Sequence, residues 1–222
     1  MMINLSGVSK IYQRGPEEIH ALQGIDLTIE SGEFIAITGK SGCGKSTLLH
    51  IIGGLEVPTT GQVSINGQNL NGLSDAELTL FRRDQVGMVF QSFNLLPLLT
   101  VQENVALPRI LQGYPYSQAL EQAAVWLAEV ELTARRQHKP HQISGGEMQR
   151  AAIARALIND PLVIIADEPT GNLDTRLGTQ VMEIFARLQA RWQKTVILAT
   201  HALEAARFGN RILQLNDGRL VS

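Results

Sequence analysis

The sequence contains a single cysteine, Cys43, among its 222 residues, so no disulfide can form within the chain. No apolar run reaches the roughly 18 to 20 residues that a membrane-spanning helix needs. The first residues lack a basic segment followed by a long apolar one, so we expect no signal peptide. These absences predict a cytoplasmic protein whose only link to a membrane would be a partner.

The chain also has little net charge, because its 19 Lys and Arg residues nearly balance its 21 Asp and Glu residues and leave a formal charge of −2. A dedicated nucleic-acid binder usually has a basic face and an excess of positive charge. The one basic run, residues 135–141, carries no interleaved aromatic side chains, and a solvated connector explains it better. We therefore expect no nucleic-acid partner. With 44% apolar and 18% charged residues, the composition is that of an ordinary globular protein.

Residues 39–47, with the sequence GKSGCGKST, fit the pattern G-x-x-x-x-G-K-[ST] of a phosphate-binding loop. Glycines let the backbone bend around an anion, so that several N–H groups point at one phosphate chain. Lys45 can reach the β- and γ-phosphates, and Ser46 can place its hydroxyl on Mg²⁺. A strand pattern precedes the loop and a helix pattern follows it, which is the context of a true P-loop. The predicted phosphate-binding residues are Gly39, Lys40, Ser41, Gly42, Cys43, Gly44, Lys45, Ser46 and Thr47.

Hydrophobic periodicity predicts an α/β fold with a P-loop (RecA-like) parallel sheet at its core. Short apolar runs predict buried strands at residues 33–38, 86–90, 162–166 and 195–199, and a last strand at 211–215. Period-two segments at 3–12 and 21–29, with a hairpin signal at Asn66-Gly67, predict a small antiparallel sheet beside that core. A turn is expected at residues 13–16 between the first two segments.

Helical patterns are concentrated in the middle of the chain. Capping boxes predict helix starts at Ser74, Thr100 and Ser144. We expect a single domain over residues 1–222, in which residues 1–91 and 161–222 form the nucleotide-binding core with its antiparallel β subdomain. Residues 92–160 are expected to form an inserted α-helical subdomain.

Three predicted strands end in polar residues, at Gln91, at Asp167-Glu168 and at His201. The carboxyl ends of parallel strands meet at one edge of the sheet, where ligands bind. Asp167 is expected to support Mg²⁺, with Gln91 as a further metal ligand or as the group that orients water. Glu168 can polarise a water for in-line attack, and such a general base contributes ~10²- to 10⁴-fold in rate. His201 can hydrogen-bond the γ-phosphate. The predicted catalytic residues are therefore Glu168, His201, Gln91 and Lys45.

Ser144-Gly145-Gly146 is a second helix start with small residues, and hence a second candidate anion site. One chain thus has two phosphate-binding helix starts but one P-loop. A head-to-tail dimer would bring the P-loop of one subunit to Ser144 of the other. An ordinary capped helix is the alternative.

Together these motifs resemble the nucleotide-binding subunit of ABC transporters over nearly the whole chain. The resemblance rests on the P-loop (Walker A), Gln91 (Q-loop), residues 143–150 (signature), Asp167-Glu168 (Walker B), residues 171–174 (D-loop) and His201 (H-loop). It implies an ATP hydrolase that uses Mg²⁺ and forms an ATP-sandwich homodimer. It also implies that Tyr12 stacks on adenine and that Ser144, Gly145, Gly146 and Asp174 contribute to the nucleotide site.

Four further segments are similar to the lipoprotein-release (LolD) and macrolide-export (MacB) group: residues 53–55, 90–97, 103–108 and 166–174. The resemblance implies an integral membrane permease partner at the inner face of the cell membrane, contacting about residues 92–108. Ala202 departs from the group, which usually has Asp after the H-loop histidine, and Ile143 replaces a commoner Leu.

Other readings of the motifs predict other partners. A division-associated relative such as FtsE would drive a membrane complex that transports nothing. ABC ATPases that serve nucleic acid carry long coiled coils or tandem cassettes, for which the sequence shows no pattern. A P-loop kinase would not need the signature or D-loop segments.

Overall fold

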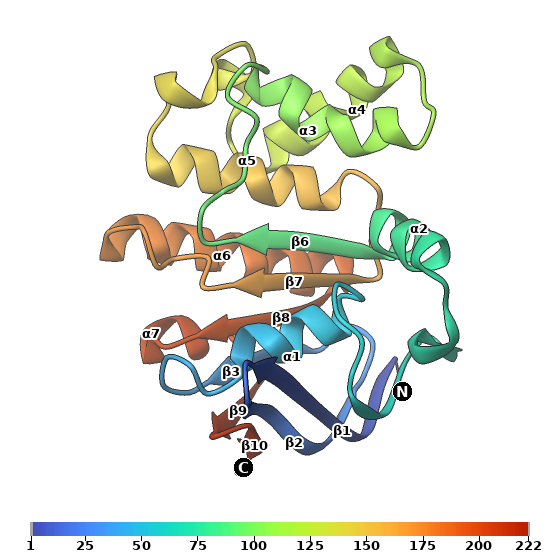
Figure 1. Cartoon of the computed structure of the whole chain (residues 1–222). Coiled ribbons are helices and arrows are strands. Elements are labelled where there is room, and N and C mark those ends of the chain that lie inside the picture. Colours follow the sequence, from blue (N-terminus) through green and yellow to red (C-terminus); the bar gives the residue numbers. More distant parts are fainter. Residues whose placement is uncertain (1, 222) are drawn as a thin grey trace.

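Two β-sheets and seven α-helices make up the part of the chain that the computed structural model describes, residues 2–221 (Figure 1). The strands are β1 (Ile3–Arg14), β2 (Glu17–Ile29), β3 (Phe34–Thr38), β4 (Thr60–Ile65), β5 (Gln68–Asn69), β6 (Val86–Phe90), β7 (Val163–Asp167), β8 (Thr195–Thr200), β9 (Arg211–Asn216) and β10 (Arg219–Leu220). The α-helices are α1 (Lys45–Ile52), α2 (Asp75–Gln85), α3 (Val101–Leu111), α4 (Tyr116–Glu129), α5 (Gly145–Leu157), α6 (Thr175–Trp192) and α7 (Leu203–Ala206). Three 3₁₀ turns occupy Leu70–Gly72, Thr133–Arg135 and Pro140–Gln142.

The larger sheet has the strand order β10-β9-β3-β8-β7-β6, and the smaller has the order β2-β1-β4-β5. All neighbours from β9 to β6 are parallel, whereas β10 and every pair in the smaller sheet are antiparallel. Parallel strands need crossover connections, and the helices supply them. The predicted α/β fold with a parallel core and a small antiparallel sheet is therefore confirmed.

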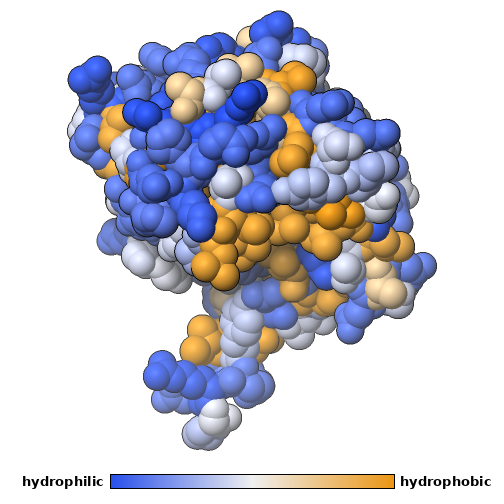
Figure 2. Space-filling view, turned by 90° about the horizontal axis from the view of Figure 1, so that it is seen from above, coloured by the Kyte–Doolittle hydropathy of each residue, from blue (hydrophilic) through white to orange (hydrophobic). Residues whose placement is uncertain are grey.

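The helices α3, α4 and α5 lie together beyond the β6 edge of the larger sheet (top of Figure 1). Thr100 and Ser144 begin α3 and α5 with the predicted capping boxes, and Ser74 begins α2 in the same way. Seen from the side of these helices, the surface is largely hydrophilic but carries a band of apolar atoms across its middle (Figure 2).

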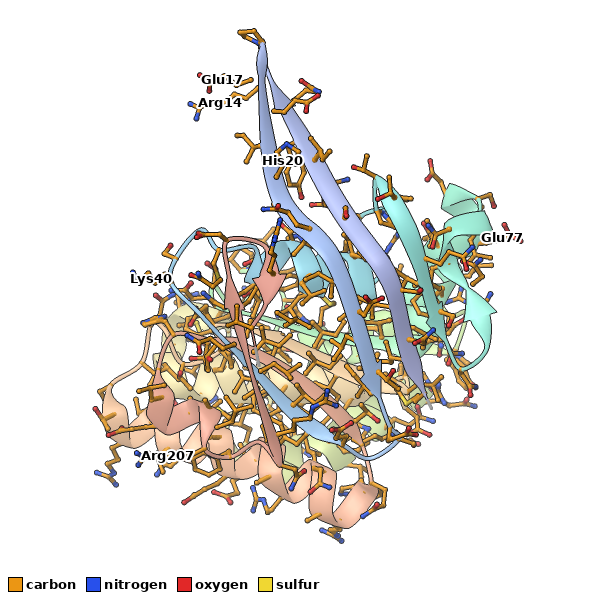
Figure 3. All side chains as sticks on the ribbon, turned by 90° about the horizontal axis from the view of Figure 1, so that it is seen from below. Arg14, Glu17, His20, Lys40, Glu77 and Arg207 are labelled. Carbon is orange, nitrogen blue, oxygen red and sulfur yellow. The ribbon has the colours of Figure 1, made fainter. Side chains whose placement is uncertain are left out.

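The hairpin of β1 and β2 extends well beyond the body of the protein (Figure 3). Both strands are longer than the periodicity predicts. Strand β1 runs to Arg14, β2 begins at Glu17, and these two residues pair with each other. Only Gly15-Pro16 forms the turn, so the predicted four-residue turn is wrong. Antiparallel backbone pairing continues in this part of the hairpin without burial of side chains. Polar residues such as Gln13 and Glu18 occupy these positions, so the strands show no apolar alternation here.

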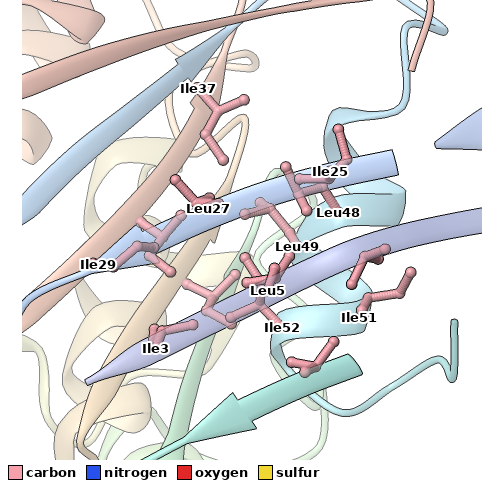
Figure 4. Close-up of a cluster of buried hydrophobic side chains, with 14 of the residues drawn as sticks. Ile3, Leu5, Ile25, Leu27, Ile29, Ile37, Leu48, Leu49, Ile51 and Ile52 are labelled. Carbon is pink, nitrogen blue, oxygen red and sulfur yellow. The ribbon is translucent and has the colours of Figure 1, made fainter. Parts of the chain in front are cut away.

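The core divides into two clusters because strand side chains alternate between faces. In β3, Ile35 and Ile37 face one cluster, together with α1 and the smaller sheet. Phe34 and Ala36 of the same strand face the other cluster, with the helices α3 to α6. Figure 4 shows the first cluster, in which Leu48 and Leu49 of α1 lie among apolar side chains of β1 and β2. Helix α1 is thus fixed between the two sheets.

None of the helices within residues 2–221 combines the length and apolarity required to cross a membrane.

Candidate active site

The P-loop connects the end of β3 to the start of α1. Gly44 occupies the N-cap of α1 with φ 106° and provides no side-chain cap, so the first N–H groups of the helix are available to an anion. A Cβ at Gly44 would lie 2.3 Å from the carbonyl oxygen of Ala21, which only glycine avoids. Lys45 is buried, and its Nζ donates to the carbonyls of Gly39 at 2.9 Å and Lys40 at 3.2 Å. The loop is therefore held curved around its own lysine.

A hollow of about 620 Å³ lies against this loop. The strand ends close it, since Gln91 follows β6, Glu168 follows β7 and His201 follows β8. The sheet topology explains why they meet, because β6, β7 and β8 are adjacent and parallel. The predicted residues that line the hollow are Ser41, Gly42, Gly44, Lys45, Ser46, Thr47, Gln91, Glu168 and His201.

Glu168 is the centre of a polar cluster in the hollow. One carboxylate oxygen lies 3.7 Å from Lys45 Nζ, and the other is 2.9 Å from His201 Nδ1. Its backbone has φ 47°, and its N–H donates to the carbonyl of Ala199 at 2.9 Å. A left-handed glutamate is uncommon and is held here by the neighbouring strand. The carboxylate is thus directed at the P-loop lysine.

Asp167 ends β7 and lines a smaller adjoining hollow together with Ser46, Gln91 and Glu168. Its Oδ1 atom is buried and has no hydrogen-bond partner among the described residues. A buried carboxylate oxygen without a partner is costly unless a cation or water satisfies it. A carboxylate, a hydroxyl and an amide are oxygen donors of the kind that Mg²⁺ prefers. The residues present therefore fit a magnesium ion.

Gln91 is held by a reciprocal pair of hydrogen bonds with Asn172. Its Nε2 donates to Asn172 Oδ1 at 3.1 Å, and Asn172 Nδ2 donates to the Gln91 carbonyl at 3.1 Å. Gly171 allows this approach, because a Cβ there would come within 2.7 Å of Gln91 Nε2. The Q-loop and the D-loop are therefore joined by two hydrogen bonds.

Several predicted site residues lie outside the large hollow. Asp174 caps α6, accepting a hydrogen bond from the Leu177 N–H at 2.9 Å, and lines a separate hollow of about 170 Å³. Tyr12, Gly39, Lys40 and Cys43 are also absent from the lining. The hollow therefore brings together Lys45, Ser46, Gln91, Glu168 and His201, but not the D-loop aspartate.

Ser144, Gly145 and Gly146 likewise do not line the hollow. The backbone N–H and the hydroxyl of Ser144 both bond to the carboxylate of Glu147, at 2.8 and 2.9 Å. The hydrogen bond from the Ser144 backbone, with Arg135 nearby, lowers the pKa of Glu147 to about 2 although its burial opposes this. The helix start is thus capped by an ionised carboxylate.

Three residues that the sequence did not indicate line the large hollow: Ile19, His20 and Ala21 of β2. Figure 3 shows His20 on the protruding hairpin. The extension of β2 to Glu17 places Ile19 and His20 there, and no apolar alternation signals it, whereas Ala21 lies at the start of the predicted strand.

Comparison with known proteins agrees with this site. Residues 22–171 match the ABC transporter family. The ABC transporter ATP-binding protein MJ0796 of Methanocaldococcus jannaschii is 49% identical, over 99% of this chain and 95% of that protein. A solved structure described as a dimeric post-hydrolysis state of MJ0796 bound to ADP and Pi matches with a TM-score of 0.92, covering 100% of this chain and 97% of that chain at 46% identity.

Two further relatives carry functional names. The lipoprotein-releasing system ATP-binding protein LolD of Zymomonas mobilis is 46% identical over 99% of this chain and 95% of its own length. The macrolide export ATP-binding/permease protein MacB of Chlorobaculum tepidum is 46% identical over 99% of this chain, which spans 34% of that protein.

The chain belongs to the ABC transporter family and is an ATP-binding ABC-type ATPase. Within the family it falls in the LolD/MacB-like group that the sequence motifs indicated.

Proposed function

We propose that the chain hydrolyses Mg-ATP as a head-to-tail homodimer and thereby drives a membrane permease of the LolD/MacB-like export or mechanotransmission type. The observation that carries the catalytic part is the Glu168 carboxylate, placed between Lys45 and His201 at the edge of the P-loop hollow. The dimeric structure of MJ0796 bound to ADP and Pi supports the dimer by similarity.

In this proposal the phosphates of ATP occupy the P-loop. The N–H groups at the start of α1 and the Lys45 ammonium bind them, and the lysine exchanges its loop carbonyls for phosphate oxygens. Asp167, Ser46 and Gln91 would hold Mg²⁺, which neutralises charge on the β- and γ-phosphates when bound.

Hydrolysis follows from the position of Glu168. Its carboxylate takes a proton from a water molecule as the water oxygen attacks the γ-phosphorus, and the bond to the β-phosphate oxygen breaks to release ADP and phosphate. His201 donates a hydrogen bond to the γ-phosphate and keeps Glu168 oriented through the 2.9 Å contact. Positioning by these groups supplies much of the rate, because phosphoryl transfer needs little covalent chemistry from the protein.

A second copy completes the site in this proposal. Ser144, Gly145 and Gly146 cannot serve the hollow of their own chain, since none of them lines it. They would face the γ-phosphate bound by the other subunit, with Asp174 at the same junction. Tyr12 would stack on adenine at the opposite end of the site.

The permease is proposed to contact about residues 92–108. Leu98 is 82% exposed and Leu96 45% exposed, whereas Leu95 packs against the helical core. These exposed leucines lie on the segment between β6 and α3. Exposed apolar groups of this kind fit a partner helix. The chain would then sit peripherally on the inner face of the cell membrane.

The substitution Glu168→Gln tests the catalytic part. The amide cannot accept the proton, so we expect turnover to fall by at least ~10²-fold while ATP binding persists. With Mg-ATP the variant should sediment as a dimer. Glu121→Gln, an exposed change on α4, is the matched control. Wild-type turnover in Glu168→Gln would rule out the assigned base, and a monomer with Mg-ATP would rule out the sandwich for the isolated subunit.

Crosslinking tests the permease contact. A cysteine at Leu98 should crosslink to a co-expressed four-span permease, and a cysteine at Val125, 63% exposed on α4, should not. Crosslinks that avoid residues 92–108 would contradict the proposed surface.

A further inference from the structure

The side chain of Tyr12 is anchored at its hydroxyl end. From β1, the hydroxyl donates a hydrogen bond to the carboxylate of Glu56 and lies 3.5 Å from the hydroxyl of Thr47. Thr47 lies in the first turn of α1, and Glu56 lies in the loop that follows this helix. One tyrosine thus contacts both the beginning of the P-loop helix and the chain just beyond its end.

Glu56 is the common partner of the groups around it. Lys10 Nζ lies 3.4 Å from one carboxylate oxygen, and His50 Nδ1 lies 3.5 Å from the other. Lys10 also donates to the Val57 carbonyl at 2.9 Å and lies 5.1 Å from the centroid of the Tyr12 ring. Strand β1, helix α1 and the following loop therefore all meet at this one carboxylate.

The protonation states suit a directed hydrogen bond. Burial, followed by the hydrogen bond to Glu56, raises the pKa of Tyr12, so its hydroxyl keeps its proton. Burial alone would raise the pKa of Glu56, but the hydrogen bond from Tyr12 and the charge of Lys10 outweigh it and lower the pKa. At neutral pH a neutral phenol therefore donates to an ionised carboxylate, which is a strong kind of hydrogen bond.

Tyr12 does not line the large hollow itself, but two of its neighbours do. Tyr12 pairs directly with Ile19 across the hairpin, and directly opposed residues project from the same face of a sheet. Ile19 lines the hollow, as does Thr47, with which the Tyr12 hydroxyl is in contact. Tyr12 thus pairs with a wall residue of the hairpin, and its hydroxyl contacts the last residue of the P-loop motif.

We propose that Glu56 is a positioning residue for nucleotide binding: it holds the Tyr12 hydroxyl against the P-loop helix and so fixes the ring on which the base stacks. This inference rests on the proposed adenine stacking by Tyr12. Without the anchor, the ring keeps its apolar face but gains rotational freedom on a hairpin that projects from the body (Figure 3). Ordering that ring then becomes part of the cost of each binding event.

The test compares a nucleotide with its phosphate part alone. Calorimetry measures the affinity of the full chain for ADP, and displacement of ADP measures the affinity for inorganic pyrophosphate. The variants are Glu56→Ala, Glu56→Gln, Tyr12→Phe, Tyr12→Ala and the double variant Tyr12→Phe/Glu56→Ala. Glu18→Ala on the exposed hairpin is the control, since Glu18 contacts Gln13 and His20 of the same hairpin.

We expect Glu56→Ala and Tyr12→Phe each to weaken ADP about tenfold and to leave pyrophosphate within about twofold of wild type, because stacking involves the base alone. The double variant should be no weaker than either single variant, since both remove one shared hydrogen bond. Glu56→Gln should bind ADP nearly as wild type, because its amide oxygen still accepts from the phenol. This rescue also separates a lost anchor from a misfolded loop.

Other results would overturn the proposal in distinguishable ways. Unchanged ADP affinity in Glu56→Ala, with a loss in Tyr12→Ala, would show that the base stacks on Tyr12 without the anchor. Equal losses for ADP and pyrophosphate would show that Glu56 merely supports α1. Wild-type ADP affinity in Tyr12→Ala would reject the stacking itself, which belongs to the proposed function.

Discussion

Arg155 of α5 holds the backbone of the loop that follows Gln91, and its replacement is expected to release that loop. The guanidinium donates to the carbonyl of Phe93 at 2.8 Å and to the carbonyl of Asn94. Phe93 and Asn94 both have left-handed backbones, with φ values of 59° and 51°. Burial lowers the pKa of Arg155, although its guanidinium stays charged. Two strained residues are thus held by one largely buried cation.

The energetic cost of the two left-handed residues is similar in size to the stabilisation by the two Arg155 hydrogen bonds. A residue held in a sparsely populated backbone region costs about 1–3 kcal/mol, so the pair costs about 2–6 kcal/mol. A hydrogen bond to a charged group contributes about 1.5–3 kcal/mol, so the two bonds contribute about 3–6 kcal/mol. Arg155→Met keeps the apolar stem but removes both bonds, which shifts the balance by about 3 kcal/mol or more. That is roughly a hundredfold change in population in favour of other loop conformations.

The assay combines kinetics with hydrogen exchange. Displacing Gln91 should lower kcat by up to ~10²-fold, as misplacement by about 1 Å does elsewhere. KM for ATP should stay within about threefold, because the P-loop is untouched. Amides of residues 92–96 should exchange faster in Arg155→Met, with Arg155→Lys intermediate because a lysine offers no planar fork. The exposed Arg207→Met is the control. Unchanged exchange and unchanged kcat in Arg155→Met would refute the reasoning.

Three further changes have defined outcomes. Ala202→Asp should supply the side-chain cap that α7 lacks and stabilise the fold by about 1 kcal/mol, raising Tm by about 2–4 °C in calorimetry, whereas Ala202→Leu should not. The depressed pKa of Glu147 contributes stability above its unfolded value of about 4.5, and this is lost as the pH falls toward about 2. Melting curves of wild type should therefore decline more steeply over that window than those of Glu147→Gln, and equal slopes would contradict the assignment. Gly44→Ala should retain the fold by circular dichroism but lose at least tenfold in ADP affinity, because strain of about 1–3 kcal/mol falls on the P-loop.

Much of the fold follows from short segments whose pattern is local. The run Val86–Phe90 is a strand at the predicted residues, and Ser74, Thr100 and Ser144 begin helices as their capping boxes indicate. Apolar runs without alternation correctly predict strands buried on both faces, because each face of the larger sheet meets its own cluster. The hairpin extension to Glu17 was missed because backbone pairing stabilises it and burial does not.

The convergence of Gln91, Glu168 and His201 was predictable for a different reason. Three apolar runs followed by polar residues place those residues at one edge once the strands are parallel, whatever their order in the sheet. The order itself, with β3 between β8 and β9, required the structure. So did the contact between Arg155 and Phe93, since the two are 62 residues apart.

The phosphate end and the base end of the proposed site differ in how far sequence can specify them. In the proposal, phosphate is bound by successive backbone N–H groups and one lysine, which a contiguous nine-residue segment supplies, and Ser41, Gly42 and Gly44 to Thr47 of that segment line the hollow. No contiguous segment of the chain provides a comparable site for the base. Tyr12 is placed by Glu56, which lies 44 residues away and reaches it only because α1 packs between the two sheets. A pattern search detects the residues whose chemistry needs consecutive positions; those that act by holding another side chain become visible only when folding has brought them together.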